Sequence, residues 1–304
     1  MAPAGDNLVC PPRPMIEPVA DGGLLVRAPA KLNLALAVGA RRGDGLHEID
    51  SIAAKVTLYD ELTFHPRPGR PASLECTGLP CGPPEANLVL RAAALLAGGV
   101  GAAGVDVRLA KRIPAGAGLG GGSSDAAAAL VALDRLRGAG LGPEALADLA
   151  AALGSDVPLF LNGPSARVRG RGERVEPVEV HDFHALLCLP EAACPTASVY
   201  AAHDAIAGGT PSGRAVAPAA FARPPGRWGG AVFNDLTAAA ERVCPPVADV
   251  RRRLAEATGR AAHVTGSSSG VFVPAADAAE ARRLAEALPA DLRTRCRIVA
   301  RNPW

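Results

Sequence analysis

One glycine-rich stretch, "AGAGLGGGSSDAAAAL" at residues 115–130, constrains the fold of this chain more than any other. Five glycines fall within seven residues, after an alternating segment that ends at Pro114 and before an alanine-rich helical pattern. Because glycine has no Cβ, the amide groups of such a turn can all approach one anion, and the next helix adds unpaired amides at its start. The stretch therefore predicts a phosphate-binding loop between a strand and a helix.

Other interpretations of this loop fit less well. A Walker A loop needs Gly-Lys-Ser/Thr, and the stretch contains no lysine. Gly116, Gly118 and Gly121 match the dinucleotide pattern G-x-G-x-x-G, but that pattern requires a fully buried parallel strand before it and an acidic residue after the second strand. Here the preceding segment alternates, and Asp134 lies inside the helical pattern. A flexible linker of biased composition is disfavoured by the strand and the helix on either side.

The composition narrows the class of protein. A formal net charge of +2 is not typical of a protein that binds nucleic acid. No apolar run is long enough to span a membrane, and residues 1–22 lack the features of a signal peptide. The seven cysteines include no Cys-x-x-Cys pair, which argues against a zinc site or a disulfide framework. We therefore expect a cytoplasmic protein. Cys76 and Cys81 could form a redox pair, but we favour two buried thiols.

Lysine is rare in this chain. Only three of the 32 lysines and arginines are lysine, namely Lys31, Lys55 and Lys111. Each is a candidate for a position that arginine cannot fill, because a compact ammonium and a planar guanidinium place their donors differently. For Lys55 no motif supports such a role, and we expect it to tolerate arginine.

The remaining pattern predicts two α+β domains. Strands are expected at 24–38 (broken by Pro29), 51–66, 105–114, 184–190, both arms of 261–274, and 295–301. Helices are expected at 87–97 (capped by Asn87), 123–138 (capped by Ser123 or Ser124), 142–154, 247–259 and 275–289. Residues 205–230 are expected to be a long connection. We place a proline-rich tail at 1–22, an N-terminal domain at 23–176 and a C-terminal domain at 177–304.

Four motifs occur in the order of one enzyme superfamily. "PAGAGLGGGSSDAAAAL" (114–130) resembles the phosphate loop of the GHMP kinases, which use ATP to phosphorylate hydroxyl groups of small molecules. The other three are similar to the branch that acts on 4-diphosphocytidyl-2-C-methyl-D-erythritol: "APAKLNLALAV" (28–38) with "RRGDGLHEIDS" (41–51), "LGSDVPLFL" (153–161) and "VTGSSSGVFV" (264–273). Leu46 stands where this branch usually has tyrosine, and Ser268 where it usually has glycine. The resemblance extends from about residue 24 to the C-terminus.

The resemblance implies a two-domain GHMP kinase fold of the α+β class, with a ribosomal protein S5 domain 2-like N-terminal domain, a ferredoxin-like C-terminal domain and an active site between them. It implies transfer of the γ-phosphoryl group of ATP, with Mg²⁺, to the 2-hydroxyl of the cytidine diphosphate methylerythritol, a step of non-mevalonate isoprenoid synthesis. The implied catalytic residues are Lys31 and Asp156. The implied ATP contacts are Asn87, Lys111, Pro114, Gly116, Gly118, Gly120, Gly121, Gly122, Ser123 and Ser124, with Ser124 as the hydroxyl for Mg²⁺ or a phosphate. The implied substrate contacts are Asn33, His47, Tyr200, Thr265 and Gly266.

The residue types of the two catalytic candidates suit the transfer of a phosphoryl group to a hydroxyl. Asp156 interrupts an apolar segment, and a partly buried carboxylate there can accept the proton of a substrate hydroxyl. Lys31 lies among apolar residues, where its point charge can hold that hydroxyl and the transferred phosphoryl group together.

Three alternatives stay open: a GHMP kinase for another alcohol, an NAD-binding oxidoreductase, and a non-catalytic nucleotide-binding protein. "AKLNL" with the downstream histidine argues against the first, and the presence of Lys31 and Asp156 against the last. As partners we expect a small-molecule substrate, no nucleic acid and no membrane, with the chain as a monomer or a weak homodimer.

Overall fold

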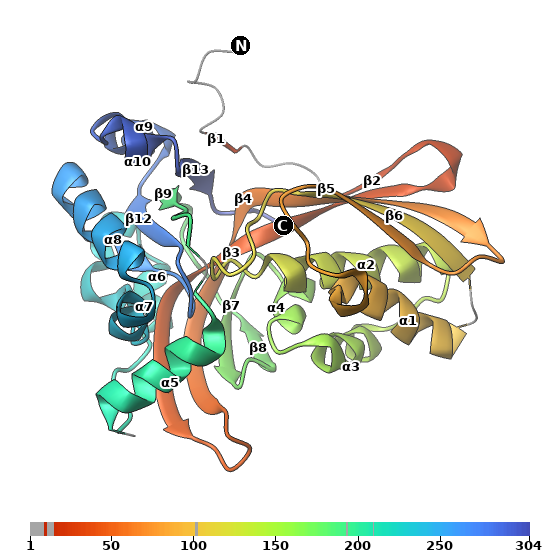
Figure 1. The fold of residues 1–304 in the computed structure, drawn as a ribbon, viewed down its shortest axis with the longest axis horizontal. Coiled ribbons are helices and arrows are strands. Elements are labelled where there is room, and N and C mark those ends of the chain that lie inside the picture. The colour runs from red at the N-terminus through yellow and green to blue at the C-terminus, as the bar shows by residue number, and fades with distance from the viewer. Residues whose placement is uncertain (1–8, 11–14, 101–102, 193, 209) are drawn as a thin grey trace.

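The computed structural model describes residues 9–10, 15–100, 103–192, 194–208 and 210–304, which fold into two β-sheets with helices packed on them (Figure 1). The larger sheet is built around two long antiparallel strands, β3 (Leu24–Arg41) and β4 (His47–Pro68). They are long because their apolar side chains enter three different hydrophobic cores along their length. The other strands of this sheet are β2 (Ile16–Pro18), β5 (Ser73–Gly78), β6 (Ala103–Lys111), β7 (Ser165–Gly170), β8 (Arg174–Pro177) and β10 (Phe233–Asn234).

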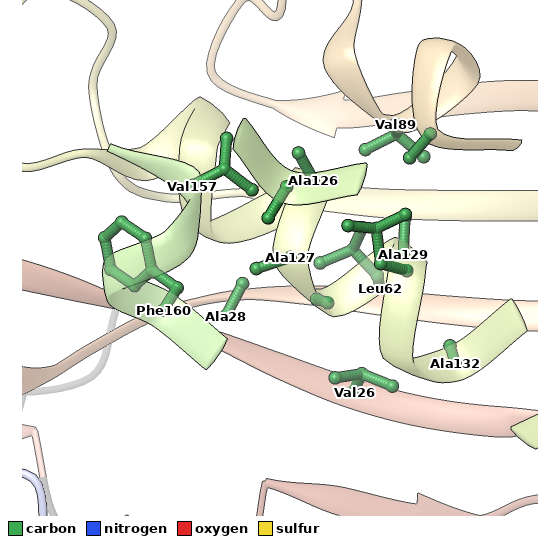
Figure 2. Close-up of a cluster of buried hydrophobic side chains, with 14 of the residues drawn as sticks. Val26, Ala28, Leu62, Val89, Ala126, Ala127, Ala129, Ala132, Val157 and Phe160 are labelled. Atoms are coloured by element: carbon green, nitrogen blue, oxygen red, sulfur yellow. The ribbon is translucent and has the colours of Figure 1, made fainter. Parts of the chain in front are cut away.

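Four helices pack on the larger sheet: α1 (Leu88–Val100), α2 (Gly121–Arg137), α3 (Pro143–Leu153) and α4 (Val157–Leu161). The alanines of α2 allow close approach, and Figure 2 shows them among Ala28, Val157 and Phe160 in the core between the helices and the sheet. This packing brings the short helix α4 against α2, directly beside the glycine-rich loop from which α2 starts.

The smaller sheet has the strand order β1-β13-β9-β12-β11. None of the described helices, in either half of the molecule, has the length and apolar character needed to cross a membrane. The strands of this sheet are β1 (Val9–Cys10), β9 (His184–Cys188), β11 (His263–Val264), β12 (Val271–Ala275) and β13 (Cys296–Ala300). The helices of this half are α5 (Thr196–Ala207), α6 (Pro218–Phe221), α7 (Thr237–Val243), α8 (Pro245–Thr258), α9 (Ala278–Glu286) and α10 (Ala290–Arg293).

The predicted strands and helices are confirmed to within a few residues at their ends, but three details are wrong. The stretch 205–230, expected to be a connection, contains the end of α5, the helix α6 and two short 3-10 helices. Pro29 does not break its strand, because β3 continues through it with a register shift against β4 between Pro29 and Ala30. Gly120 occupies the N-cap position of α2, and no side chain caps this helix. Asn87 does cap α1, since its Oδ1 accepts a hydrogen bond from Val89 N at 2.9 Å.

Strand pairing joins parts of the predicted tail and of the predicted C-terminal domain to strands elsewhere in the chain. Residues 1–8 and 11–14 of the tail lie outside the described residues. Val9–Cys10 pairs with β13 and Ile16–Pro18 pairs with β3, so these parts are strands. β10 follows the predicted boundary near residue 176, yet it pairs with β3 of the larger sheet. The boundary itself stays a prediction.

The prediction for two of the cysteines is wrong. Cys76 and Cys81 form a disulfide, with their Cα atoms 6.7 Å apart, and both residues are half-buried. The turn after β5 brings the two together, which a spacing of five residues did not reveal. Cys188, Cys194, Cys244 and Cys296 are free and buried.

Candidate active site

A cavity of about 480 Å³ lies between the glycine-rich loop, β3, the start of α5 and the turn between β11 and β12. It is lined by elements of both halves of the molecule, and it gathers most of the predicted site residues. Those that line it are Lys31, Asn33, Asn87, Lys111, Pro114, Gly116, Gly118, Gly120, Gly121, Gly122, Ser123, Asp156, Tyr200 and Gly266. His47, Ser124 and Thr265 are not among its lining residues.

The glycine-rich loop reaches the cavity through backbone that side chains would obstruct. Gly118 and Gly120 have φ of +75° and +69°, a region that favours glycine. A Cβ on Gly118 would lie 2.2 Å from Thr265 O, so only bare backbone fits there. Ser124 N donates to Gly120 O at 2.9 Å, and the amides of residues 121–123 precede this bond without an acceptor in the helix. These amides and the helix start suit a phosphate.

The turn between β11 and β12 is fixed against this loop. Gly270 N donates to Ala117 O at 3.1 Å, and Asn234 Nδ2 donates to Gly266 O at 2.7 Å and to Val264 O at 3.0 Å. Asn234 was not predicted, because a single asparagine outside any motif gives no signal in sequence. Ser268 has no positive φ, so serine at this position imposes no backbone strain.

Lys31 lies beneath the loop with only 5% of its surface exposed. Its ammonium donates to Asn33 Oδ1, and Asn33 Nδ2 donates to Ser51 Oγ at 2.8 Å. Burial lowers the pKa of Lys31, and the charge of Asp156 opposes this shift. Asn33 therefore orients Lys31 and also lines the cavity, and its contact with substrate stays a prediction.

Asp156 lines the same cavity from the residue before α4. It occupies the N-cap position, but its carboxylate does not cap the helix. Burial, followed by the charge of Asp156, raises the pKa of Tyr200 to about 12. A half-buried carboxylate electrostatically coupled to the Lys31 ammonium is an arrangement that can take the proton of a hydroxyl group.

Lys111 belongs to a buried charge cluster under the start of α2. Its ammonium donates to Asp60 and, at 2.7 Å, to Asp125 Oδ2. Burial, followed by the charge of Asp60, raises the pKa of Asp125 to about 8. A Cβ on Gly121 would lie 3.0 Å from Lys111 Nζ. The ammonium therefore supports the loop from below, and because Lys111 also lines the cavity, its contact with ATP stays a prediction.

His47 lies beside the cavity wall, stacked on Tyr200 with the ring centroids 5.4 Å apart. Its Nε2 is 2.9 Å from Asp204 Oδ1, and its Nδ1 is 3.3 Å from Gly39 O. Both ring nitrogens thus face protein oxygens, so His47 holds Tyr200 and α5 against the β3–β4 hairpin instead of offering a free nitrogen to a ligand. Leu46 is 48% exposed and does not line the cavity.

Two predicted hydroxyl groups are directed elsewhere. Ser124 Oγ is buried without a hydrogen-bond partner and lines a second cavity, of about 190 Å³, that Lys55 also lines. Ser123 lines the larger cavity, so it replaces Ser124 as the candidate hydroxyl for a phosphate or Mg²⁺. Thr265 is fully buried, and its Oγ1 accepts a hydrogen bond from Asn33 N at 2.9 Å. Thr265 therefore supports the backbone of β3.

Comparisons with known proteins agree with this geometry. Residues 87–164 match the model of the GHMP kinases N terminal domain. The chain is 40% identical over 264 residues to 4-diphosphocytidyl-2-C-methyl-D-erythritol kinase of Pelotomaculum thermopropionicum, covering 85% of this chain and 91% of that protein. It is 41% identical over 282 residues to the same enzyme of Thermobifida fusca, covering 87% and 91%.

The fold is also similar to that of a solved structure of such a kinase. A crystal structure of 4-(cytidine 5'-diphospho)-2C-methyl-D-erythritol kinase superposes with a TM-score of 0.69 at 37% sequence identity. The superposition covers 91% of this chain and 97% of that one. The loop here follows β6, which is parallel to β5 but antiparallel to β4, so it does not follow a strand of an all-parallel sheet as a dinucleotide-binding loop does.

Proposed function

The chain belongs to the 4-diphosphocytidyl-2-C-methyl-D-erythritol kinase family of the GHMP kinases, and from this premise we propose how its cavity performs the reaction. The protein is a kinase that acts in the synthesis of isoprenoid precursors. Its acceptor is the 2-hydroxyl of 4-diphosphocytidyl-2-C-methyl-D-erythritol. The observation that carries the proposal is that Lys31, Asp156 and the glycine-rich loop line the same cavity. The oligomeric state and the compartment stay predictions.

ATP is proposed to lie along the glycine-rich loop. The unpaired amides of residues 121–123 face its phosphates, and the adenosine end extends toward Asn87 and Pro114. Mg²⁺ enters with ATP as part of that substrate. Among the described residues there is no group of three His, Cys, Asp or Glu that suits a metal, which fits an ion held mainly by phosphate oxygens, with the Ser123 hydroxyl beside them.

The acceptor hydroxyl is proposed to lie between Lys31 and Asp156. Its oxygen bonds to the γ-phosphorus while the bond from this phosphorus to the β–γ bridging oxygen breaks, and ADP leaves. Asp156 takes the proton of the hydroxyl. Lys31, held by Asn33, neutralises charge on the phosphoryl group. Catalysis then consists mainly of positioning and charge stabilisation.

Tyr200 is proposed to stack on the cytosine base. Tyr200→Ala should weaken binding of the cytidine substrate by about 1–3 kcal/mol, the range for base–aromatic stacking, and leave ATP affinity unchanged. Titration calorimetry with each substrate measures both affinities. Tyr200→Phe is the control, because it keeps the ring and should bind like the parent protein. An unchanged affinity in Tyr200→Ala would remove Tyr200 from the base platform.

The proposed activity is tested by coupled ADP release with a panel of alcohols that includes the cytidine diphosphate compound. We expect kcat/KM for this compound to exceed that for every other alcohol by at least about 100-fold, a difference of roughly 2.7 kcal/mol. A preparation from cells that do not produce this protein, purified in the same way, measures any contaminating kinase. A preference for another alcohol would change the substrate and leave the kinase assignment intact.

A further inference from the structure

Lys55 is a buried cation that the proposed reaction does not use. Only 3% of its surface is exposed, although the sequence suggested a position that tolerates arginine. In the pairing of β3 with β4, Lys55 lies directly opposite Lys31. Residues opposite each other in an antiparallel pair place their side chains on the same face of the sheet. The two lysines therefore share the face on which α4 packs.

Lys55 binds the end of α4 that is remote from Asp156. Its Nζ donates to Asn162 O at 2.5 Å and to Phe160 O at 3.1 Å. The last carbonyls of a helix lack partners within the helix and carry the negative end of its dipole, so a cation is favourable there. No carboxylate in the described part of the chain forms an ion pair with Lys55, so these carbonyls are its partners.

The short helix α4 needs such an anchor. A helix of five residues is far below the length that is stable alone, so its position depends on tertiary contacts. A Cβ on Gly120 would lie 2.8 Å from Phe160 Cζ and 3.2 Å from Lys31 Cγ. The ring of Phe160 thus packs against the glycine-rich loop next to Lys31. A shift of α4 would move Phe160 and Asp156 together relative to both.

We propose that Lys55 is a positioning residue, which holds the C-terminal end of α4 and thereby fixes the Asp156 carboxylate, at the other end of this helix, relative to Lys31. The proposal rests on the proposed role of Asp156 as the base. A displacement of a reacting group by about 1 Å can cost on the order of 10²-fold in rate. A loosened α4 therefore costs turnover even if both substrates still bind.

A purely stabilising role explains Lys55 less well. Burial lowers the pKa of Lys55 to about 8, below the ordinary value of a lysine, so folding disfavours its charged form. Since the unfolded chain binds this proton more tightly, Lys55 reduces stability at neutral pH, and this cost shrinks as the pH rises from about 8 toward the ordinary lysine pKa of 10.5. A neutral side chain of similar length avoids that cost. Stability and turnover should therefore respond to its replacement in different ways.

The test is Lys55→Met, which keeps the length of the side chain and removes its donors. We expect kcat to fall at least tenfold at neutral pH, with KM for ATP and for the cytidine substrate within about threefold of the parent values. The unfolding midpoint should stay within about 5 °C of the parent or rise. Amide hydrogen exchange of the segment 154–163 should become faster. Lys55→Arg keeps a cation for the two carbonyls and should recover part of kcat.

The matched control is Arg293→Met. Arg293 Nη2 donates to Glu286 O and Leu288 O at the end of α9, so it makes the same kind of contact away from the cavity. This variant should keep kcat. Turnover within twofold of the parent in Lys55→Met, or an equal loss in both methionine variants, would overturn the proposal. If Asp156→Asn also keeps its turnover, Asp156 is not the base, and the proposed function fails at that point. If Asp156→Asn is slow while Lys55→Met turns over like the parent protein, only the positioning role of Lys55 is rejected.

Discussion

Asp156→Asn should fold and bind both substrates, with kcat lowered by about 10²–10⁴-fold. The amide has nearly the shape of the carboxylate but cannot accept the proton of the acceptor hydroxyl. Because Asp156 does not cap α4, the exchange removes no helix-capping bond. Single-turnover rates measured with saturating ATP and cytidine substrate give the loss in the chemical step.

A second measurement separates the base from its electrostatic effect on Lys31. The charge of Asp156 raises the pKa of Lys31 against the lowering effect of burial, so this ammonium should lose its proton at lower pH in the variant. If acidification to about pH 6 restores the rate, Asp156 acts through the charge of Lys31. If the loss persists there, Asp156 is the base. Asp148→Asn, on the exposed surface of α3, is the control and should keep full activity.

The sequence could predict the phosphate loop because its chemistry is local. Unpaired amides at a helix start and glycines with positive φ are encoded by one continuous stretch, and the structure places that stretch on the cavity. Lys31 and Asp156 could be assigned to this cavity because each lies in a recognisable motif, while their catalytic roles stay proposals. The helix α2 was predicted because it is a long alanine-rich run that ends at Gly138, which is its C-cap.

Contacts between distant segments could not be predicted in this way. Asn234 holds the turn between β11 and β12, and Asp204 holds His47, but neither belongs to a motif. The choice between Ser123 and Ser124 depends on how α2 is rotated about its axis, which the packing of its alanines against the sheet determines. A sequence with two adjacent serines carries no information on that rotation.

The scarcity of lysine proved more informative than expected. Lys31, Lys55 and Lys111 are all at least 95% buried, and each donates to oxygen atoms in a confined space. A guanidinium is planar and wider than an ammonium and places its donors in a fixed fork, so it does not fit a space shaped for a compact ammonium. This explains why these positions keep lysine in a chain that otherwise uses arginine, and it makes Lys55 unsuitable as a neutral control.

Gly122→Val should abolish ATP binding at millimolar concentration while the protein stays folded. Gly122 is exposed in the first turn of α2 and lines the cavity, and a Cβ there would meet nothing within 4 Å. Valine is therefore tolerated by the protein itself but occupies the space that the phosphates need. Losing two hydrogen bonds to a charged phosphate costs about 3–6 kcal/mol, which is roughly 10²–10⁴-fold in Kd.

Gly121 would be a poorer choice for this test, because its Cβ would lie 2.9 Å from Ile113 Cγ2 and disturb the core. Gly98→Val is the matched control, since Gly98 is also an exposed helical glycine with open space around its Cβ. Fluorescence titration with a nucleotide analogue gives Kd, and thermal unfolding confirms that both variants fold. If Gly122→Val binds ATP as tightly as Gly98→Val does, the phosphates lie away from the start of α2. The bare backbone would then serve only the contact between the loop and the turn at Thr265, where a Cβ on Gly118 cannot fit.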